Sequence, residues 1–193
     1  MKKTGRHNFK SKTEQNLISI GIGLVIGIVL IISIIGVIQL MNKNKSKIKP
    51  KTFSYEIDEN DEVTILGLSD WGKDAALVVI PETIDGKRVE SIADNAFSDN
   101  NNITSISLPN GLEKIGNRAF YNCSKLTEIT LPDSLISVGS ECFANCGVTT
   151  IRFPKNMVSI GINACLNIEN VEYYSDFVTG APWGAANATA VTE

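Results

Sequence analysis

Three consecutive segments of the chain carry the same pattern of apolar and polar positions. They begin at Ile103 as ITSISLPNGLEKIGNRAFYNC, at Leu126 as LTEITLPDSLISVGSECFANC and at Val148 as VTTIRFPKNMVSIGINACLNI. Each contains a proline, an apolar residue six positions later and a glycine directly after it. Steps of 23 and 22 residues are shorter than repeats made of helical pairs, so the pattern predicts a solenoid in which each repeat is one coil stacked on the next.

The start of each repeat predicts a short β-strand. In LTEITLP, Ile129 and Leu131 point to one face of an extended segment, and Glu128 and Thr130 point to the other. Pro132 then removes a backbone donor, so the strand is expected to end there. The apolar residues that follow the proline are spaced as in a turn, and the glycine allows the chain to bend.

One interior position is filled by phenylalanine in successive copies. Phe120 and Phe143 share it, Phe97 occupies it in an earlier, degenerate copy that begins near Val78, and Cys165 fills it in the last copy. Because no single copy buries its apolar face alone, the three rings are expected to stack as a ladder. Each buried ring would contribute roughly 1.5–3 kcal/mol.

The copies resemble the BspA-type leucine-rich repeat. Its pattern is similar to L-x-x-I-x-I-P-x-x-L-x-x-I-G-x-x-A-F-x-x-C, which residues 126–146 match almost position by position. The resemblance extends from about Val78 to Tyr174. It implies a leucine-rich-repeat solenoid of short parallel β-strands with loops and helical turns, whose repeats are interaction scaffolds with no shared chemistry.

A long apolar segment precedes the repeats. Residues 17–41 carry no charge, and as a helix rising ~1.5 Å per residue they would cross a ~30 Å hydrocarbon core. A cleaved secretory signal is the alternative, but its apolar run would span only roughly 7–15 residues and end in small residues. We therefore predict one N-terminal transmembrane α-helix. Ser19, Gly23 and Gly27 recur every four residues and form a candidate helix–helix contact for a weak homodimer, although small residues are common in membrane helices generally.

Charge divides sharply along the chain. Residues 1–51 contain ten Lys and Arg against one acid, whereas residues 52–193 contain eight against twenty. The acidic repeat part argues against nucleic acid as a partner. Five basic residues lie on each side of the apolar segment, so charge leaves the orientation open. The resemblance to surface proteins favours an extracellular repeat domain; the alternative places it in the cytoplasm.

These observations divide the chain into six predicted parts. They are a basic cytoplasmic tail (1–16), a transmembrane helix in the cell membrane (17–41), a Lys-rich linker (42–52), an N-terminal β-hairpin cap (53–74), about four leucine-rich repeats (75–177) and a C-terminal cap (178–193). Three compatible interpretations of the linker stay open: contact with anionic lipid headgroups, contact with an anionic wall polymer if the linker faces out, and a solvated spacer that holds the domain off the membrane. Trp183 and Phe177 are expected to fold over the last coil.

The sequence offers little catalytic chemistry. Its one histidine, His7, lies in the basic tail, so the repeat domain lacks Ser/His/Asp and Cys/His machinery. Asp58, Asn60 and Glu62 have the spacing of a calcium loop, but Val63 replaces the required glycine. We expect no enzyme activity, no cofactor and no metal.

The four cysteines are expected to be structural thiols. Cys123 and Cys146 occupy the same position in successive copies, and Cys142 and Cys165 replace core residues. A disulfide between the stacked pair and a zinc site are the alternatives.

The candidate partner-binding surface is the exposed face of the strands, because solenoids bind through such faces. Its residues are Leu77, Val79, Ser105, Ser107, Glu128, Thr130, Thr150, Arg152, Tyr173 and Ser175. Small hydroxyl and β-branched residues also suit exposed strands that bind nothing. We predict a membrane-anchored cell-surface module that binds or adheres to a protein or glycan partner. The alternatives are a structural spacer or assembly subunit of a membrane complex, and a catalytic domain.

Overall fold

The computed structural model describes residues 52–174 and 180–191, all within one compact unit, Ile48–Glu193. No helix in this part of the chain is long and apolar enough to span a membrane. The predicted transmembrane helix, with Ser19, Gly23 and Gly27, lies outside the described residues.

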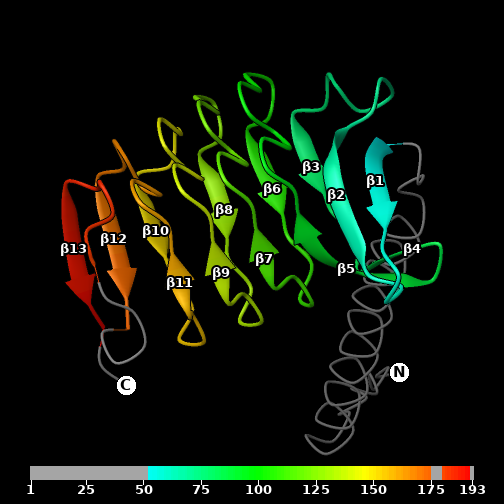
Figure 1. Cartoon of the computed structure of the whole chain (residues 1–193). Coiled ribbons are helices and arrows are strands. Elements are labelled where there is room, and N and C mark those ends of the chain that lie inside the picture. The colour runs from blue at the N-terminus through cyan, green and yellow to red at the C-terminus, as the bar shows by residue number, and fades with distance from the viewer. Residues whose placement is uncertain (1–51, 175–179, 192–193) are drawn as a thin grey trace, which may run out of the picture. The chain divides into compact units, whose positions relative to one another are not determined.

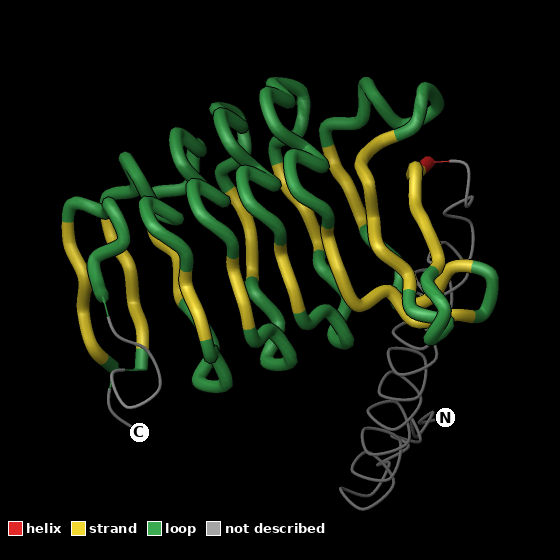
Figure 2. Tube along the Cα trace, viewed as in Figure 1, coloured by secondary structure: helices red, strands yellow, loops and turns green. Residues whose placement is uncertain are grey.

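The strands of successive coils line up on two faces of the solenoid, which we call the first and second sheets, and the last coil contributes a strand to the first sheet only (Figures 1 and 2). The first sheet contains β3 (Leu77–Val79), β6 (Ser105–Ser107), β8 (Glu128–Thr130), β10 (Thr150–Arg152) and β12 (Asn170–Tyr173). The second contains β5 (Lys87–Ile92), β7 (Lys114–Ile115), β9 (Ser137–Val138) and β11 (Ser159–Ile160). Strands that pair between successive coils are parallel, as the repeat pattern predicts.

Additional strands lie at both ends of the solenoid. At the N-terminal end, β1 (Phe53–Ile57) and β2 (Val63–Leu68) form an antiparallel hairpin, and β2 pairs with β5. The short β4 (Thr83–Ile84) also pairs with β5, in the longer loop of the first copy. At the other end, β13 (Asn187–Ala190) pairs in parallel with β12. Both end coils are therefore extended by β-structure.

The predicted phenylalanine ladder is confirmed. The ring centroids of Phe97 and Phe120 are 5.2 Å apart with 4° between the planes, and those of Phe120 and Phe143 are 5.5 Å apart with 5°. All three rings are buried. Trp183 is buried as expected and makes edge contacts with Phe153 and Tyr173 at centroid distances of 5.8 and 5.3 Å.

The second half of each coil differs from the sequence expectation. The segment after each proline contains a two-residue strand where only a turn was expected. No described residue of the repeats belongs to a helix, and the turns are single i→i+3 turns such as the one closed by Tyr121 N–H and the Arg118 carbonyl at 3.1 Å. The glycine that follows the two-residue strand allows close stacking: a Cβ at Gly116 would lie 2.5 Å from the Asp94 amide nitrogen. The rest of the coil runs as turns with left-handed residues such as Arg118 and Asn122, at φ 54° and 57°.

A polar ladder that the sequence analysis missed supports these turns. Asn122 Nδ2 donates to Asp99 Oδ1 at 2.8 Å, and Asn167 Nδ2 donates to Asn145 Oδ1 at 2.6 Å. All four residues have positive φ, a conformation in which Asn and Asp are enriched. The signal in the sequence is the Asn or Asp two positions after the stacked phenylalanine slot.

The cysteines are free thiols that complete the core. The Sγ atoms of Cys123 and Cys146 donate to the carbonyl oxygens of Phe97 and Phe120, at 3.0 and 2.9 Å. Burial raises the pKa of Cys165 to about 12. No group of three or more His, Cys, Asp or Glu suited to a metal ion occurs within residues 52–174 and 180–191.

Candidate functional site

The first sheet is interrupted between β8 and β10. Strands β3, β6 and β8 form one hydrogen-bonded sheet, and β10, β12 and β13 form another. β8 and β10 are nevertheless neighbours, with Cα atoms that approach within 8 Å. The interruption leaves two strand edges facing each other without ladder hydrogen bonds between them.

The third repeat, which begins at Leu126 when the degenerate copy near Val78 is counted as the first, is one residue shorter than the second repeat, which begins at Ile103. Gly147 alone separates Cys146 from Val148, whereas two residues separate the corresponding positions of the second repeat. The Gly147 amide donates to the Cys123 carbonyl at 3.2 Å, and a Cβ at Gly147 would lie 2.5 Å from the Ser124 carbonyl oxygen. We attribute the interruption to this short connection, because a coil with one residue fewer brings β10 beside β8 without the hydrogen-bonded pairing that the other successive strands make.

The peptide groups on the β10 edge face β8. Asn170 N–H donates to the Thr149 carbonyl, and Phe153 N–H donates to the Glu172 carbonyl, both at 2.9 Å. Peptide groups alternate in direction along a strand, so those of Thr150 and Arg152 point the other way, toward β8.

The same alternation orients β8. The Ser107 carbonyl accepts from Ile80 N–H at 2.9 Å, so Ser107 faces β3 and Ile106 faces β8. Ile129 pairs in register with Ile106, and its own peptide group therefore faces β10. The side chain of Ile129 is half-buried, whereas the central residues of the other first-sheet strands, Val78, Ile106, Ile151 and Val171, are buried.

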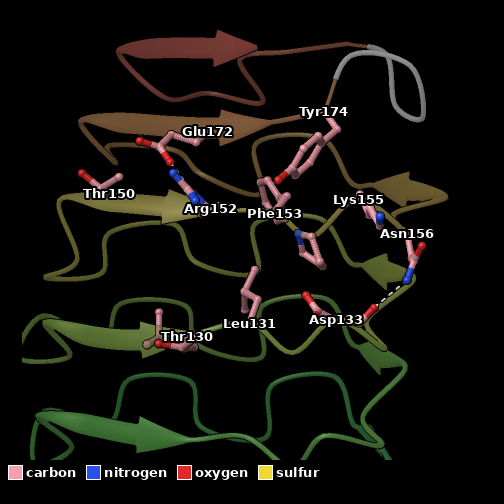
Figure 3. A pocket seen from close by; sticks show the side chains of 12 residues that line it. Thr130, Leu131, Asp133, Thr150, Arg152, Phe153, Lys155, Asn156, Glu172 and Tyr174 are labelled. Atoms are coloured by element: carbon pink, nitrogen blue, oxygen red, sulfur yellow. Dashed lines mark hydrogen bonds and ion pairs between the residues drawn. The ribbon is translucent and has the colours of Figure 1, made fainter. Parts of the chain in front are cut away.

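A cleft of about 720 Å³ opens at the interruption (Figure 3). We call it the β8–β10 cleft. Its lining is Ile129, Thr130, Leu131, Asp133, Thr150, Arg152, Phe153, Pro154, Lys155, Asn156, Glu172 and Tyr174. A smaller cavity of about 350 Å³ adjoins it, because Ile129 and Thr130 line both.

The cleft combines an ion pair, polar loop residues and an aromatic ring. Arg152 Nε lies 2.5 Å from Glu172 Oε2, and this contact raises the pKa of Arg152. The side chain of Arg152 remains 63% exposed and that of Glu172 34%. Asn156 Nδ2 donates to the Asp133 carbonyl oxygen at 2.9 Å. Figure 3 shows Tyr174 extending from the end of β12 toward Phe153.

The structure places the predicted surface residues in three groups. Thr130, Thr150 and Arg152 line the β8–β10 cleft. Glu128, Ser105 and Ser107 line the smaller cavity. Leu77 and Val79 lie on β3 and are 73% and 39% exposed.

The predicted alignment of the last coil with the preceding one was wrong, because the outward residues were placed three positions too far along the chain. Thr150 pairs with Asn170 and Arg152 with Glu172, so the step is 20 residues and the outward positions are Asn170 and Glu172. Tyr173 is half-buried, and its ring packs edge-on against Trp183 instead of facing outward. Ser175 lies outside the described residues.

Several cleft residues were missed from the sequence. Asp133, Lys155 and Asn156 lie in loops after the strand prolines, and Glu172 and Tyr174 belong to the coil with the wrong register. The available signal was the change from a 23- to a 22-residue step, which marks the position of the interruption.

Comparisons with known proteins agree with this fold. The family described as BspA type Leucine rich repeat region matches residues 90–179 in six copies. A leucine-rich repeat protein from Bacteroides capillosus is 23% identical, with a TM-score of 0.52, over 57% of this chain and 83% of that one. The pneumococcal vaccine antigen PcpA is 19% identical, with a TM-score of 0.57, over 72% of this chain and 35% of that one. No curated protein matches the chain.

Proposed function

Because residues 90–179 belong to the BspA type of leucine-rich repeat, we propose that the chain is a binding module of the cell surface. In this proposal residues 17–41 anchor it in the cell membrane, and the repeats lie outside the cell and bind a protein or glycan partner. The observation that carries the binding role is the β8–β10 cleft, which opens on the strand face predicted to bind. Its volume of about 720 Å³ falls within the roughly 300–1,000 Å³ range of ligand sites.

The chemistry of the cleft supports binding in preference to catalysis. Its lining contains two threonine hydroxyls and no histidine, cysteine or serine side chain, the residues most often used in nucleophilic catalysis. The carboxylate of Glu172 is engaged by Arg152, so it is not poised as a free general base. These residues suit a site that holds a polar partner.

The membrane anchor and the outward orientation rest on the sequence. The apolar segment is long enough to span a bilayer, and it is followed by lysine-rich residues instead of a cleavage site. Protease treatment of intact cells carrying the full chain tests the orientation. Degradation of residues 53–193 without lysis is expected, and full protection until lysis would reverse it.

The binding role is tested with two matched threonine variants. Thr150→Trp places an indole at the cleft edge, and Thr189→Trp adds the same bulk to an exposed position of β13. The full-length chain in lipid nanodiscs is exposed to arrays of extracellular proteins and glycans. We expect binding that Thr150→Trp weakens by about tenfold or more, as expected for loss of a few kcal/mol of contact, and that Thr189→Trp leaves unchanged. Equal effects of the two variants would contradict the role of the cleft.

A further inference from the structure

We propose that the β8–β10 cleft binds a neutral oligosaccharide, with its hydroxyl groups bonded to the open strand edges and one sugar ring against Tyr174. This inference rests on the proposed binding function and specifies the ligand of that site. It combines three features of the cleft: balanced charge, unpaired peptide groups and an aromatic ring at the rim.

The charge of the lining favours a neutral ligand. Two basic side chains, Arg152 and Lys155, are balanced by two acidic ones, Asp133 and Glu172. The Arg152 guanidinium is held directly by Glu172 at 2.5 Å. An anionic ligand such as a phosphorylated or sulfated molecule would compete with these carboxylates, because recognition of such groups relies on uncompensated Arg and Lys. We therefore expect the cleft to prefer a polar ligand that carries no net charge.

The open strand edges favour a ligand whose groups both donate and accept. Ile129 on one side, and Thr150 and Arg152 on the other, present N–H and C=O groups in close succession. A sugar hydroxyl donates one hydrogen bond and accepts others, so neighbouring hydroxyls can satisfy both kinds of group. Ile129, Thr150 and Arg152 line the open cleft, so hydroxyl groups of a bound sugar would take the place of water at their peptide groups.

The width of the interruption distinguishes a sugar from an inserted peptide strand. A peptide paired with both edges would hold β8 and β10 roughly 9.5 Å apart, twice the strand spacing of about 4.8 Å. Cα atoms of the two strands approach within 8 Å. A third strand therefore does not fit between them, and we place the sugar on the open face with its hydroxyl groups directed at the strand edges.

Tyr174 supplies the surface against which a sugar ring packs. It is half-buried, and Figure 3 shows its ring extending toward Phe153 at the rim of the cleft. An aromatic face offers apolar contact to the C–H groups of a sugar ring, and the phenol hydroxyl keeps a polar end. Asn156 and the threonines at positions 130 and 150 add amide and hydroxyl groups around it.

The test uses the full-length chain in lipid nanodiscs and an array of defined oligosaccharides. The array contains matched neutral and acidic series, the latter sialylated or sulfated, and a separate array carries peptides. We expect binding to at least one neutral oligosaccharide. Its affinity, measured by calorimetry, should change less than about twofold between 50 and 500 mM salt, because screening acts on charged ligands.

Matched variants assign the binding to the cleft. Tyr174→Ala removes the ring, and Arg152→Ala leaves the Glu172 carboxylate in the cleft without its partner, so each is expected to weaken oligosaccharide binding by about tenfold or more. Tyr174→Phe keeps the ring and should stay within about threefold of the parent. The controls are Tyr121→Ala and Arg118→Ala, which come from another surface: Arg118 Nε lies 2.7 Å from Glu141 Oε2, and its guanidinium sits 5.1 Å from the Tyr121 ring centroid. If one variant fails to fold by circular dichroism, the other and Thr150→Trp decide the outcome.

The possible failures of this inference and of the proposed function are separable. Binding only to acidic oligosaccharides, or only to peptides, in a manner sensitive to Thr150→Trp would overturn the neutral-glycan inference and leave the cleft as a binding site. Binding that is insensitive to Thr150→Trp, or no binding on either array, would overturn both.

Discussion

Truncation of the central ring of the phenylalanine ladder should destabilise the whole repeat domain. Phe120 is 0% exposed and lies between Phe97 at 5.2 Å and Phe143 at 5.5 Å. Burial of one such side chain contributes about 1.5–3 kcal/mol, and each stacked pair adds about 0.5–1.5 kcal/mol. We therefore expect Phe120→Ala to reduce the free energy of unfolding by about 3–5 kcal/mol, in the range of large-to-small core substitutions.

Equilibrium unfolding in urea, followed by circular dichroism on the compact unit Ile48–Glu193, measures this loss. Phe97→Ala is the matched comparison, because its ring stacks on one phenylalanine only and should cost about 1 kcal/mol less. Leu77→Ala, at a position that is 73% exposed, should change stability by less than about 0.5 kcal/mol. A loss below about 1 kcal/mol for Phe120→Ala, or a larger loss for Phe97→Ala, would refute the ladder as a main source of stability.

Three further changes test other parts of the account. Gly116→Ala should cost about 1–3 kcal/mol in urea unfolding, because the new Cβ would lie 2.5 Å from the Asp94 nitrogen; a neutral effect would contradict the close stacking. Trp183→Ala should cost about 3–5 kcal/mol and Trp71→Ala, 82% exposed, less than about 1 kcal/mol; similar losses would contradict the C-terminal cap. Burial raises the pKa of Cys165 from 9.0 to about 12, so folding favours its protonated form, and this contribution to stability is present below pH 9 and declines as pH rises from about 9 toward 12. Alkylation by iodoacetamide at pH 8 should accordingly modify Cys165 only after unfolding, and rapid modification of the native protein would contradict its burial.

Residues with a strong periodic signal were predicted correctly. The strand at residues 128–130 follows from alternation before a proline, and the ladder of Phe97, Phe120 and Phe143 follows from their common position. Trp183 was expected in the C-terminal cap and is buried there. These features depend on side-chain type at a fixed period, which a sequence displays directly.

Other features depend on backbone geometry that the pattern does not carry. Two-residue strands such as Ser137–Val138 are too short for alternation to reveal. The last coil has no proline landmark, so its 20-residue step was overestimated and Tyr173 was assigned to the wrong face. The cleft arises because Gly147 shortens a connection, and the effect of one missing residue on neighbouring strands appears only when the coils are stacked.

The most direct test of the open cleft is amide hydrogen exchange at two adjacent residues. Phe153 N–H donates to the Glu172 carbonyl at 2.9 Å, whereas the peptide group of Arg152 faces the interruption between β8 and β10. In the unliganded protein we expect the Arg152 amide to exchange about a hundredfold faster than the Phe153 amide or more, as measured by NMR. Equal protection of the two amides would mean that β8 and β10 are joined in one continuous sheet, and the proposed binding cleft would not exist.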